Sequence, residues 1–128
     1  MAKNEKEVKV TAPTRNKAIA ITTNIRITPR KMRLVIDLVR GKSLSEAYGI
    51  LANTNKAASD VVLKTIKSAE ANAVNNFHMI PTDLYISEIY AGDGARLKRF
   101  LPRAKGSASG IIKRLSRLTV VVSGKGAK

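Results

Sequence analysis

Hydrophobic positions recur with two different periods along the chain, and these periods predict a mixture of strands and helices. From Ala18 to Ile27, apolar residues alternate with small or polar ones in AIAITTNIRI, which is typical of a half-buried strand. The alternation returns in LYISEIYAG from Leu84 and in LTVVVSG from Leu118, and both stretches are rich in β-branched or aromatic residues. The sequence therefore predicts three strands. Between the first and the second of them, the hydrophobic residues follow a helical period.

Three helices are predicted between the first two strands. In TPRKMRLVIDLVRG, Thr28 is placed to cap a helix, Pro29 suits its first position and Gly41 its end. In SLSEAYGIL, Ser43 and Glu46 have the spacing of a capping box. The third helix runs from about residue 56 to 76. The apolar stripes of the three helices are, in order, Met32, Val35, Ile36 and Val39; Leu44, Ala47, Tyr48 and Leu51; and Ala58, Val62, Ile66, Ala69 and Ala73.

A second, polar row on the first helix contains three arginines. Arg30, Arg33, Asp37 and Arg40 recur at steps of three, four and three. Such a row is either a solvated face or a surface that contacts RNA phosphates, and three arginines with one acid favour phosphate contact slightly.

Length and composition indicate one domain with a modest core, since the chain has 128 residues of which 44% are hydrophobic. Residues 1–17 are polar and charged, so we expect a mobile N-terminal tail. The remainder, 18–128, is expected to form a single domain.

Charge identifies the class of partner. The formal net charge is +15, and all nine acids lie at or before Asp93. So basic a chain is expected to bind nucleic acid or an anionic membrane. No apolar run is long enough to span a membrane, and no secretory signal or cysteine is present, so we expect a cytoplasmic protein without a membrane partner.

The most basic stretch, residues 94–114, lies between the last two strands and predicts a protruding hairpin. If it continues both strands, about ten residues per arm reach about 30 Å, against a radius of gyration of about 14 Å for a globule of this size. Glycines at 92, 94, 106 and 110 are expected to permit bends, and Phe100, Leu101 and Pro102 to wedge against bases or sugars. The alternative is a flexible basic loop whose apolar residues fold back on the body.

Residues that would support catalysis or metal binding are sparse. His78 is the only histidine, and its neighbours suggest a packing or capping role. Asp83, Glu88 and Asp93 are spread over both ends and the middle of one predicted strand, which argues against a shared magnesium ion. We expect no enzyme activity, no cofactor and no metal site, and a role as an RNA-modifying enzyme is disfavoured.

Several motifs, in the same order, resemble the family of bacterial large-subunit ribosomal protein L twenty-two. They are TPRKMRLVIDLVRGKSLSEAYGILANTNKAAS, VLKTIKSAEANAVNN and RLKRFLPRAKGSASGIIKRLSRLTVVVSG, and they are spread over about a hundred residues. The resemblance implies an α+β domain in which three helices pack on a small antiparallel three-stranded sheet that a long basic β-hairpin leaves. It also implies a structural protein that binds and crosslinks 23S ribosomal RNA during assembly.

The resemblance further implies that the hairpin lines the nascent-peptide exit tunnel near the macrolide site. The residues carried over to the tunnel-facing tip are Leu97, Lys98 and Arg99, with Arg103, Ala104, Lys105 and Gly106 beside them. The expected RNA-binding residues are Arg30, Arg33, Arg40, Arg96, Lys98, Arg99, Arg103, Lys105, Lys113, Arg114 and Arg117. Expected partners are 23S ribosomal RNA, neighbouring large-subunit proteins and the nascent polypeptide, without homo-oligomers.

Two positions depart from the family pattern: Ser107 stands where a basic residue is common, and Arg117 where a histidine is common. The charge at Arg117 is therefore permanent. The competing hypothesis is a DNA-bending architectural protein whose basic ribbon lies in the minor groove, with Phe100 or Pro102 as a wedge. Such proteins usually act as symmetric dimers, and no dimer seam is evident in the sequence.

Overall fold

The computed structural model describes residues 17–124. The predicted tail, 1–17, lies outside the described residues except for Lys17, which is the first residue of a strand instead. Residues 125–128 of the predicted domain also lie outside them.

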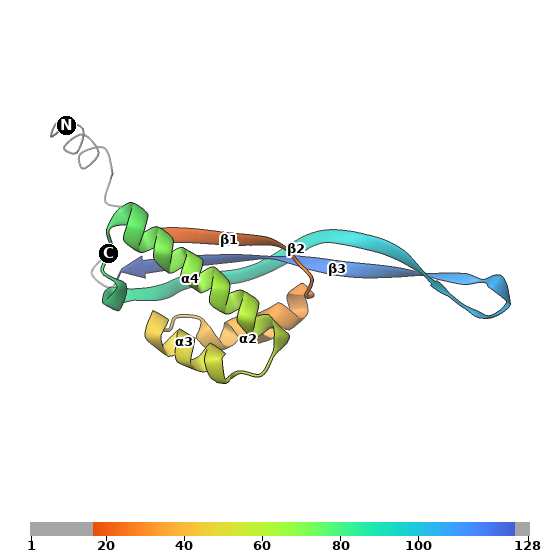
Figure 1. Ribbon diagram of the computed structural model, residues 1–128, viewed down its shortest axis with the longest axis horizontal. Coiled ribbons are helices and arrows are strands. Elements are labelled where there is room, and N and C mark those ends of the chain that lie inside the picture. The colour runs from red at the N-terminus through yellow and green to blue at the C-terminus, as the bar shows by residue number, and fades with distance from the viewer. Residues whose placement is uncertain (1–16, 125–128) are drawn as a thin grey trace, which may run out of the picture.

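The described chain is an α+β domain of three helices on an antiparallel sheet, as predicted. Its strands are β1 (Lys17–Ile25), β2 (Leu84–Pro102) and β3 (Ala108–Gly124), in the order β1-β3-β2. The helices α2 (Pro29–Val39), α3 (Leu44–Asn53) and α4 (Ala57–Phe77) lie together on one face of the sheet (Figure 1). Short 3-10 turns, η1 (Pro81–Asp83) and η2 (Ala104–Gly106), precede β2 and join β2 to β3.

The core forms where the apolar stripes of the helices meet the inward face of the sheet. Every residue of the predicted stripes is buried except Tyr48, which is half-buried. From the sheet, alternate residues point inward, and the largest of these that are fully buried are Leu84, Ile86, Leu118, Val120 and Val122. Because the buried side chains of α4 include several alanines, that helix can pack close to β1.

Helix ends follow the predicted positions, with one difference in chemistry. Thr28 is the N-cap of α2, but its side chain makes no capping hydrogen bond, so that part of the prediction is wrong. Pro29 takes the next position and has no N–H to satisfy, which reduces the need for a cap. Ser43 does cap α3, accepting from the Glu46 N–H, and His78 ends α4 in the left-handed conformation with its N–H bonded to the Ala73 carbonyl.

A tyrosine and a glutamate tie α3 to α4. The Tyr48 hydroxyl donates a hydrogen bond to the Glu70 carboxylate. Burial raises the pKa of the Tyr48 phenol well above its ordinary value, and the hydrogen bond to Glu70 raises it further. The phenol therefore stays protonated and remains a donor throughout the physiological range.

We predict that Met32→Ala lowers the free energy of unfolding by about 2–5 kcal/mol, because Met32 is 0% exposed in the core and its truncation leaves a cavity. Leu34, two residues along α2, is 68% exposed and provides the matched control. Leu34→Ala should change the same quantity by less than about 0.5 kcal/mol. Urea unfolding of both variants measures this, and equal losses would contradict the assigned face of α2.

A candidate nucleic-acid interface

The last two strands continue beyond the body as a two-stranded ribbon. β1 pairs with β3 only as far as Ile25, which faces Ser116. Beyond that point β2 and β3 pair only with each other, from Arg96 facing Arg114 to Pro102 facing Ala108. Figure 1 shows this ribbon projecting well past the helices. The structure thus has the protruding hairpin that the sequence predicts.

A bulge marks the base of the ribbon. Asp93 faces Ser116 and the next pair is Arg96 with Arg114, so Gly94 and Ala95 together oppose one residue of β3. A Cβ atom on Gly94 would lie 3.1 Å from the Leu115 carbonyl carbon, so the close approach of the two strands favours glycine. Of the other glycines expected to bend the hairpin, Gly106 has a positive φ, whereas Gly92 and Gly110 have neither a positive φ nor a close neighbour.

Basic side chains lie on both faces of the ribbon. Residues that face each other across the strands point to the same side, and successive residues alternate. One face therefore carries Arg96, Lys98 and Arg114, and the other carries Arg99 and Lys113. A basic stripe on one face would suit binding to a flat surface, but this ribbon presents positive charge in every direction.

Two arginines are directly opposite one another near the base. Arg96 and Arg114 are register partners, which sets their Cβ atoms about 4.5–5.5 Å apart. Both are exposed, and neither forms an ion pair within residues 17–124. Like charges in this position destabilise a sheet, so the ribbon gains stability when an anion lies between or beside them.

The tip is an ordered turn made by Arg103, Ala104, Lys105 and Gly106. The Arg103 N–H donates to the Ser107 carbonyl at 2.8 Å, and the Ser107 hydroxyl donates to the Ala104 carbonyl at 2.8 Å. Lys105 and Gly106 are both left-handed, with φ of 58° and 72°. Leu97, Lys98 and Arg99, expected near the tip, lie on the strand before it. Arg117 lies at the base, where it faces Gly92.

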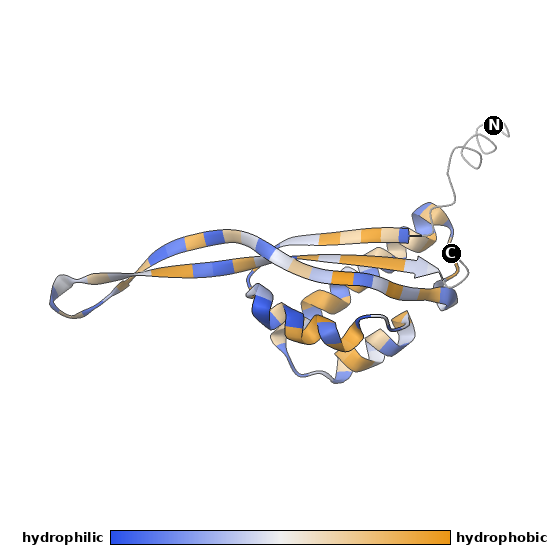
Figure 2. Ribbon diagram, turned by 180° about the vertical axis from the view of Figure 1, so that it is seen from behind, coloured by the Kyte–Doolittle hydropathy of each residue, from blue (hydrophilic) through white to orange (hydrophobic). Residues whose placement is uncertain are grey.

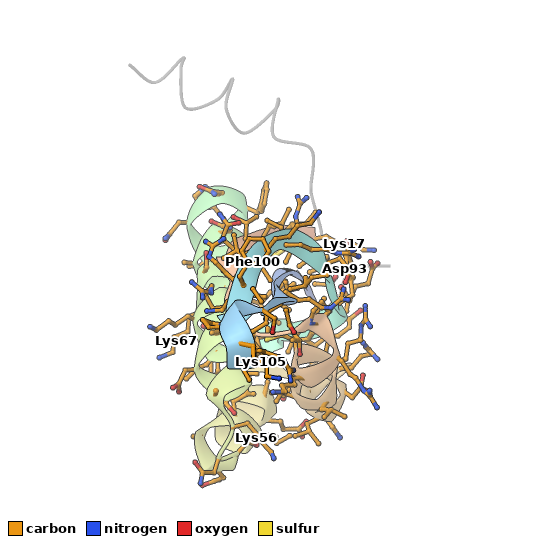
Figure 3. All side chains as sticks on the ribbon, turned by 90° about the vertical axis from the view of Figure 1, so that its right-hand side faces the viewer. Lys17, Lys56, Lys67, Asp93, Phe100 and Lys105 are labelled. Atoms are coloured by element: carbon orange, nitrogen blue, oxygen red, sulfur yellow. The ribbon has the colours of Figure 1, made fainter. Side chains whose placement is uncertain are left out.

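Several apolar residues of the hairpin are exposed. Phe100 is 81% exposed, and Leu101 and Ile112 are also exposed. Figure 3, which looks along the ribbon from its turn, labels Phe100 and Lys105. The ribbon alternates between apolar and polar residues along its length (Figure 2). The alternative of a basic loop that folds back on the body is therefore wrong.

On the body, two of the three predicted arginines hold the edge of the sheet. Arg33 donates to the Ala91 carbonyl at 3.2 Å, and Arg40 to the Ile89 carbonyl at 3.0 Å. Arg40 also pairs with the Asp37 carboxylate at 2.7 Å. Arg30 makes no such bond within the described residues. This role could not be predicted from the sequence, because the carbonyls belong to a strand about fifty residues away and no local pattern indicates that contact.

The described residues include no group of three or more His, Cys, Asp or Glu side chains placed to hold a metal ion. Asp83 lies in η1, separate from Glu88 and Asp93 on β2. Across residues 17–124, no helix combines the length and apolar character needed to cross a membrane.

Residues 20–123 match the family model described as "Ribosomal protein L22p/L17e". The chain belongs to this family. Members are structural, non-enzymatic components of the large ribosomal subunit, so this chain is a structural protein of that subunit and works with the ribosome in the cytoplasm. Association with ribosomal RNA and other ribosomal proteins follows from the same membership.

Curated relatives carry the same assignment over almost their whole length. The chain is 57% identical over 106 residues to "Large ribosomal subunit protein uL22" of Lactobacillus delbrueckii subsp. bulgaricus, covering 83% of this chain and 91% of the relative. It is 56% identical over 105 residues to the protein of that name from Clostridium novyi, covering 82% and 95%. These matches give no support to the DNA-bending alternative.

Replacing each arginine of α2 by methionine tests which of them stabilises the fold. Arg33→Met and Arg40→Met should each lower the free energy of unfolding by about 1 kcal/mol, because a β2 carbonyl loses its donor. Arg30→Met, the matched control on the same helix, should change it by less than about 0.5 kcal/mol. Urea unfolding measures this free energy for all three variants. An equal loss for Arg30→Met would show that the hydrogen bonds to the β2 carbonyls do not account for the loss of stability.

Proposed function

We propose that this chain crosslinks 23S ribosomal RNA during assembly of the large subunit, and that its hairpin lines the nascent-peptide exit tunnel near the macrolide site. The observation that carries the proposal is the ribbon with basic side chains on both faces and no protein core beneath it. Such an element is stabilised when RNA surrounds it, because phosphates then neutralise Arg96 and Arg114 together with their neighbours.

The body and the ribbon divide the work of binding. Arg30 and the free N–H groups of Arg33 and Arg40 contact phosphates next to the sheet edge, whereas the ribbon reaches RNA that lies farther away. Arginine suits this role because its planar guanidinium binds phosphate through two hydrogen bonds and stacks on bases. One chain thus holds separate RNA segments at a fixed distance.

The ordered turn gives the ribbon a defined end that can form part of a tunnel wall. Arg103, Ala104, Lys105 and Gly106 are exposed there. Leu97, Lys98 and Arg99 lie further back on the arm and contribute either to the wall or to the RNA behind it. In this arrangement the passing nascent polypeptide contacts the turn, while neighbouring ribosomal proteins contact the body.

Salt dependence tests the electrostatic part of the proposal. If about five phosphates are neutralised, raising the salt concentration fourfold should weaken binding to a 23S transcript about a hundredfold. Log affinity falls as log salt concentration rises. Replacing Arg96, Lys98, Lys113 and Arg114 by glutamine should make this slope shallower by about three. The control replaces Phe100 and Ile112 by glutamine and should keep the slope. A nearly flat response of the native chain would contradict the proposal.

Site-specific photocrosslinking on translating ribosomes tests the tunnel assignment. With a photoreactive residue at Ala104, in the turn, we expect crosslinks to the nascent chain. The same residue at Lys67, which points outward from α4 in Figure 3, should give none. Variant chains must first cosediment with the large subunit on a magnesium-containing sucrose gradient. Cosedimentation without a nascent-chain crosslink from Ala104 would overturn the tunnel role and leave the RNA role standing.

A further inference from the structure

A hollow of about 390 Å³ opens on the body where β1 ends, between that strand and α4. Its lining comes from residues 22–27 of the chain and from Val61, Lys64 and Thr65 of α4. The lining residues of β1 are the last four of that strand, and Figure 1 shows that this end of β1 is the one nearer the ribbon. None of these residues belongs to the hairpin or to the arginine row of α2. The volume falls within the range of about 300–1,000 Å³ typical of small-ligand sites.

The hollow has apolar walls and two cations among its lining residues. Ile25 is buried, and Ile27 and Val61 are half-buried. Arg26 and Lys64 are exposed, and neither forms an ion pair within residues 17–124. The lining includes no acid. This combination suits a ligand with a flat apolar part and a negative charge.

The hydroxyl groups of Thr22 and Thr65 determine whether the hollow offers a ligand a hydrogen-bond donor or an acceptor. The Thr65 hydroxyl donates to the Val61 carbonyl at 2.9 Å. Its single proton is thereby used, so in the 2.8 Å contact between the two hydroxyls Thr22 is the donor and Thr65 the acceptor. Thr22 then has no proton left and can only accept from a ligand. A ligand that reaches Thr22 must present an N–H or O–H group.

A bulge in β1 shapes the mouth of the hollow. Thr22 faces Leu118 and the next pair is Ile25 with Ser116, so two residues of β1 oppose one of β3. Asn24 takes the left-handed conformation there, with φ of 57°, which asparagine tolerates better than most residues. The hollow therefore lies where the bulged end of β1 meets α4, and it is present in the structure without a ligand.

We propose that this hollow binds one unstacked nucleotide of ribosomal RNA. The base lies against Ile25, Ile27 and Val61 and donates an N–H to Thr22, while Arg26 and Lys64 bind its phosphate and the next one. Proteins usually recognise RNA through such splayed-out bases of single-stranded segments. The inference rests on the proposed function, and it adds a third RNA contact that is separate from the ribbon and from α2.

An acidic peptide of a neighbouring protein is the competing occupant, since it also combines apolar and negative groups. RNA is favoured because the chain carries a net charge of +15 and belongs to a ribosomal family. A base also presents the N–H groups that Thr22 requires on a rigid, flat frame.

The first experiment titrates the isotope-labelled full chain with adenosine monophosphate (AMP) and follows backbone amide shifts by NMR. We expect the shifts to cluster at residues 22–27 and 61–65. Lys64→Gln should weaken binding about tenfold, because a charge-assisted hydrogen bond is lost. Lys67→Gln, one turn along α4 and outside the lining, is the matched control and should change little. Equal losses in both variants, or shifts confined to the ribbon, would overturn the proposal.

The second experiment tests the acceptor at Thr22. Purine riboside monophosphate differs from AMP only by the missing amino group and has no N–H on its base, so it should bind about three- to tenfold more weakly. In Thr22→Val, whose side chain has the same shape without the hydroxyl, the two nucleotides should bind alike. Discrimination that persists in this variant would overturn the role of Thr22. Tighter binding of an acidic peptide such as Leu-Asp-Leu-Asp at the same amides would show that the occupant is a protein.

The outcomes separate this inference from the proposed function. If AMP fails to bind the hollow while the salt-dependent binding of the 23S transcript is retained, the hollow is not a nucleotide site and the function of the ribbon stands. If AMP binds the hollow but the transcript shows a flat salt response, the proposed function fails. Amide spectra of each variant confirm that the fold is intact before either conclusion is drawn.

Discussion

The unequal length of the strands is the constraint on which the rest of the structure depends. β1 has nine residues, whereas β2 has 19 and β3 has 17. Where all three strands are present, helices cover one face and a core forms. Where only two remain, no other segment within residues 17–124 covers either face, and a bare two-stranded ribbon is marginally stable in water. A surrounding partner would therefore stabilise the ribbon, and the excess of basic residues on it favours a polyanion, in agreement with the function that we propose.

Charge links the two parts of the molecule. On the ribbon, basic residues have no acidic partner among residues 17–124 and repel one another. On the body, Arg33 and Arg40 bond to carbonyls of β2, the same strand that leaves to form the ribbon. The edge of β2 is thus held by groups that also present positive charge outward. In the function that we propose, a residue of this kind would serve the fold and contact RNA as well, so its replacement would affect both.

Much of the fold was predictable because the period at which hydrophobic residues recur indicates which side chains are buried. The stripes from Met32 to Val39 and from Ala58 to Ala73 point inward as the helical period predicts, and Pro29 and Gly41 mark the limits of the first helix. The family motifs supplied the arrangement of helices on the sheet. Periodicity could not predict which side chains hold the sheet edge or the hollow beside Asn24, because both arise from contacts between residues far apart in sequence. The absence of a side-chain cap at Thr28 likewise depends on geometry that the motif does not specify.

The end of β1 also has a mechanical consequence. The body is much broader than the ribbon, as Figure 1 shows, so a tunnel that admits the ribbon, as we propose, would stop the body at its mouth. The depth of insertion would then be set by the number of β2–β3 residue pairs beyond the end of β1 at Ile25, and not by affinity. Lengthening β2 and β3 together by two residues each would move the turn about 7 Å further into the tunnel. In that arrangement, the length of β2 and β3 would set how far the turn reaches.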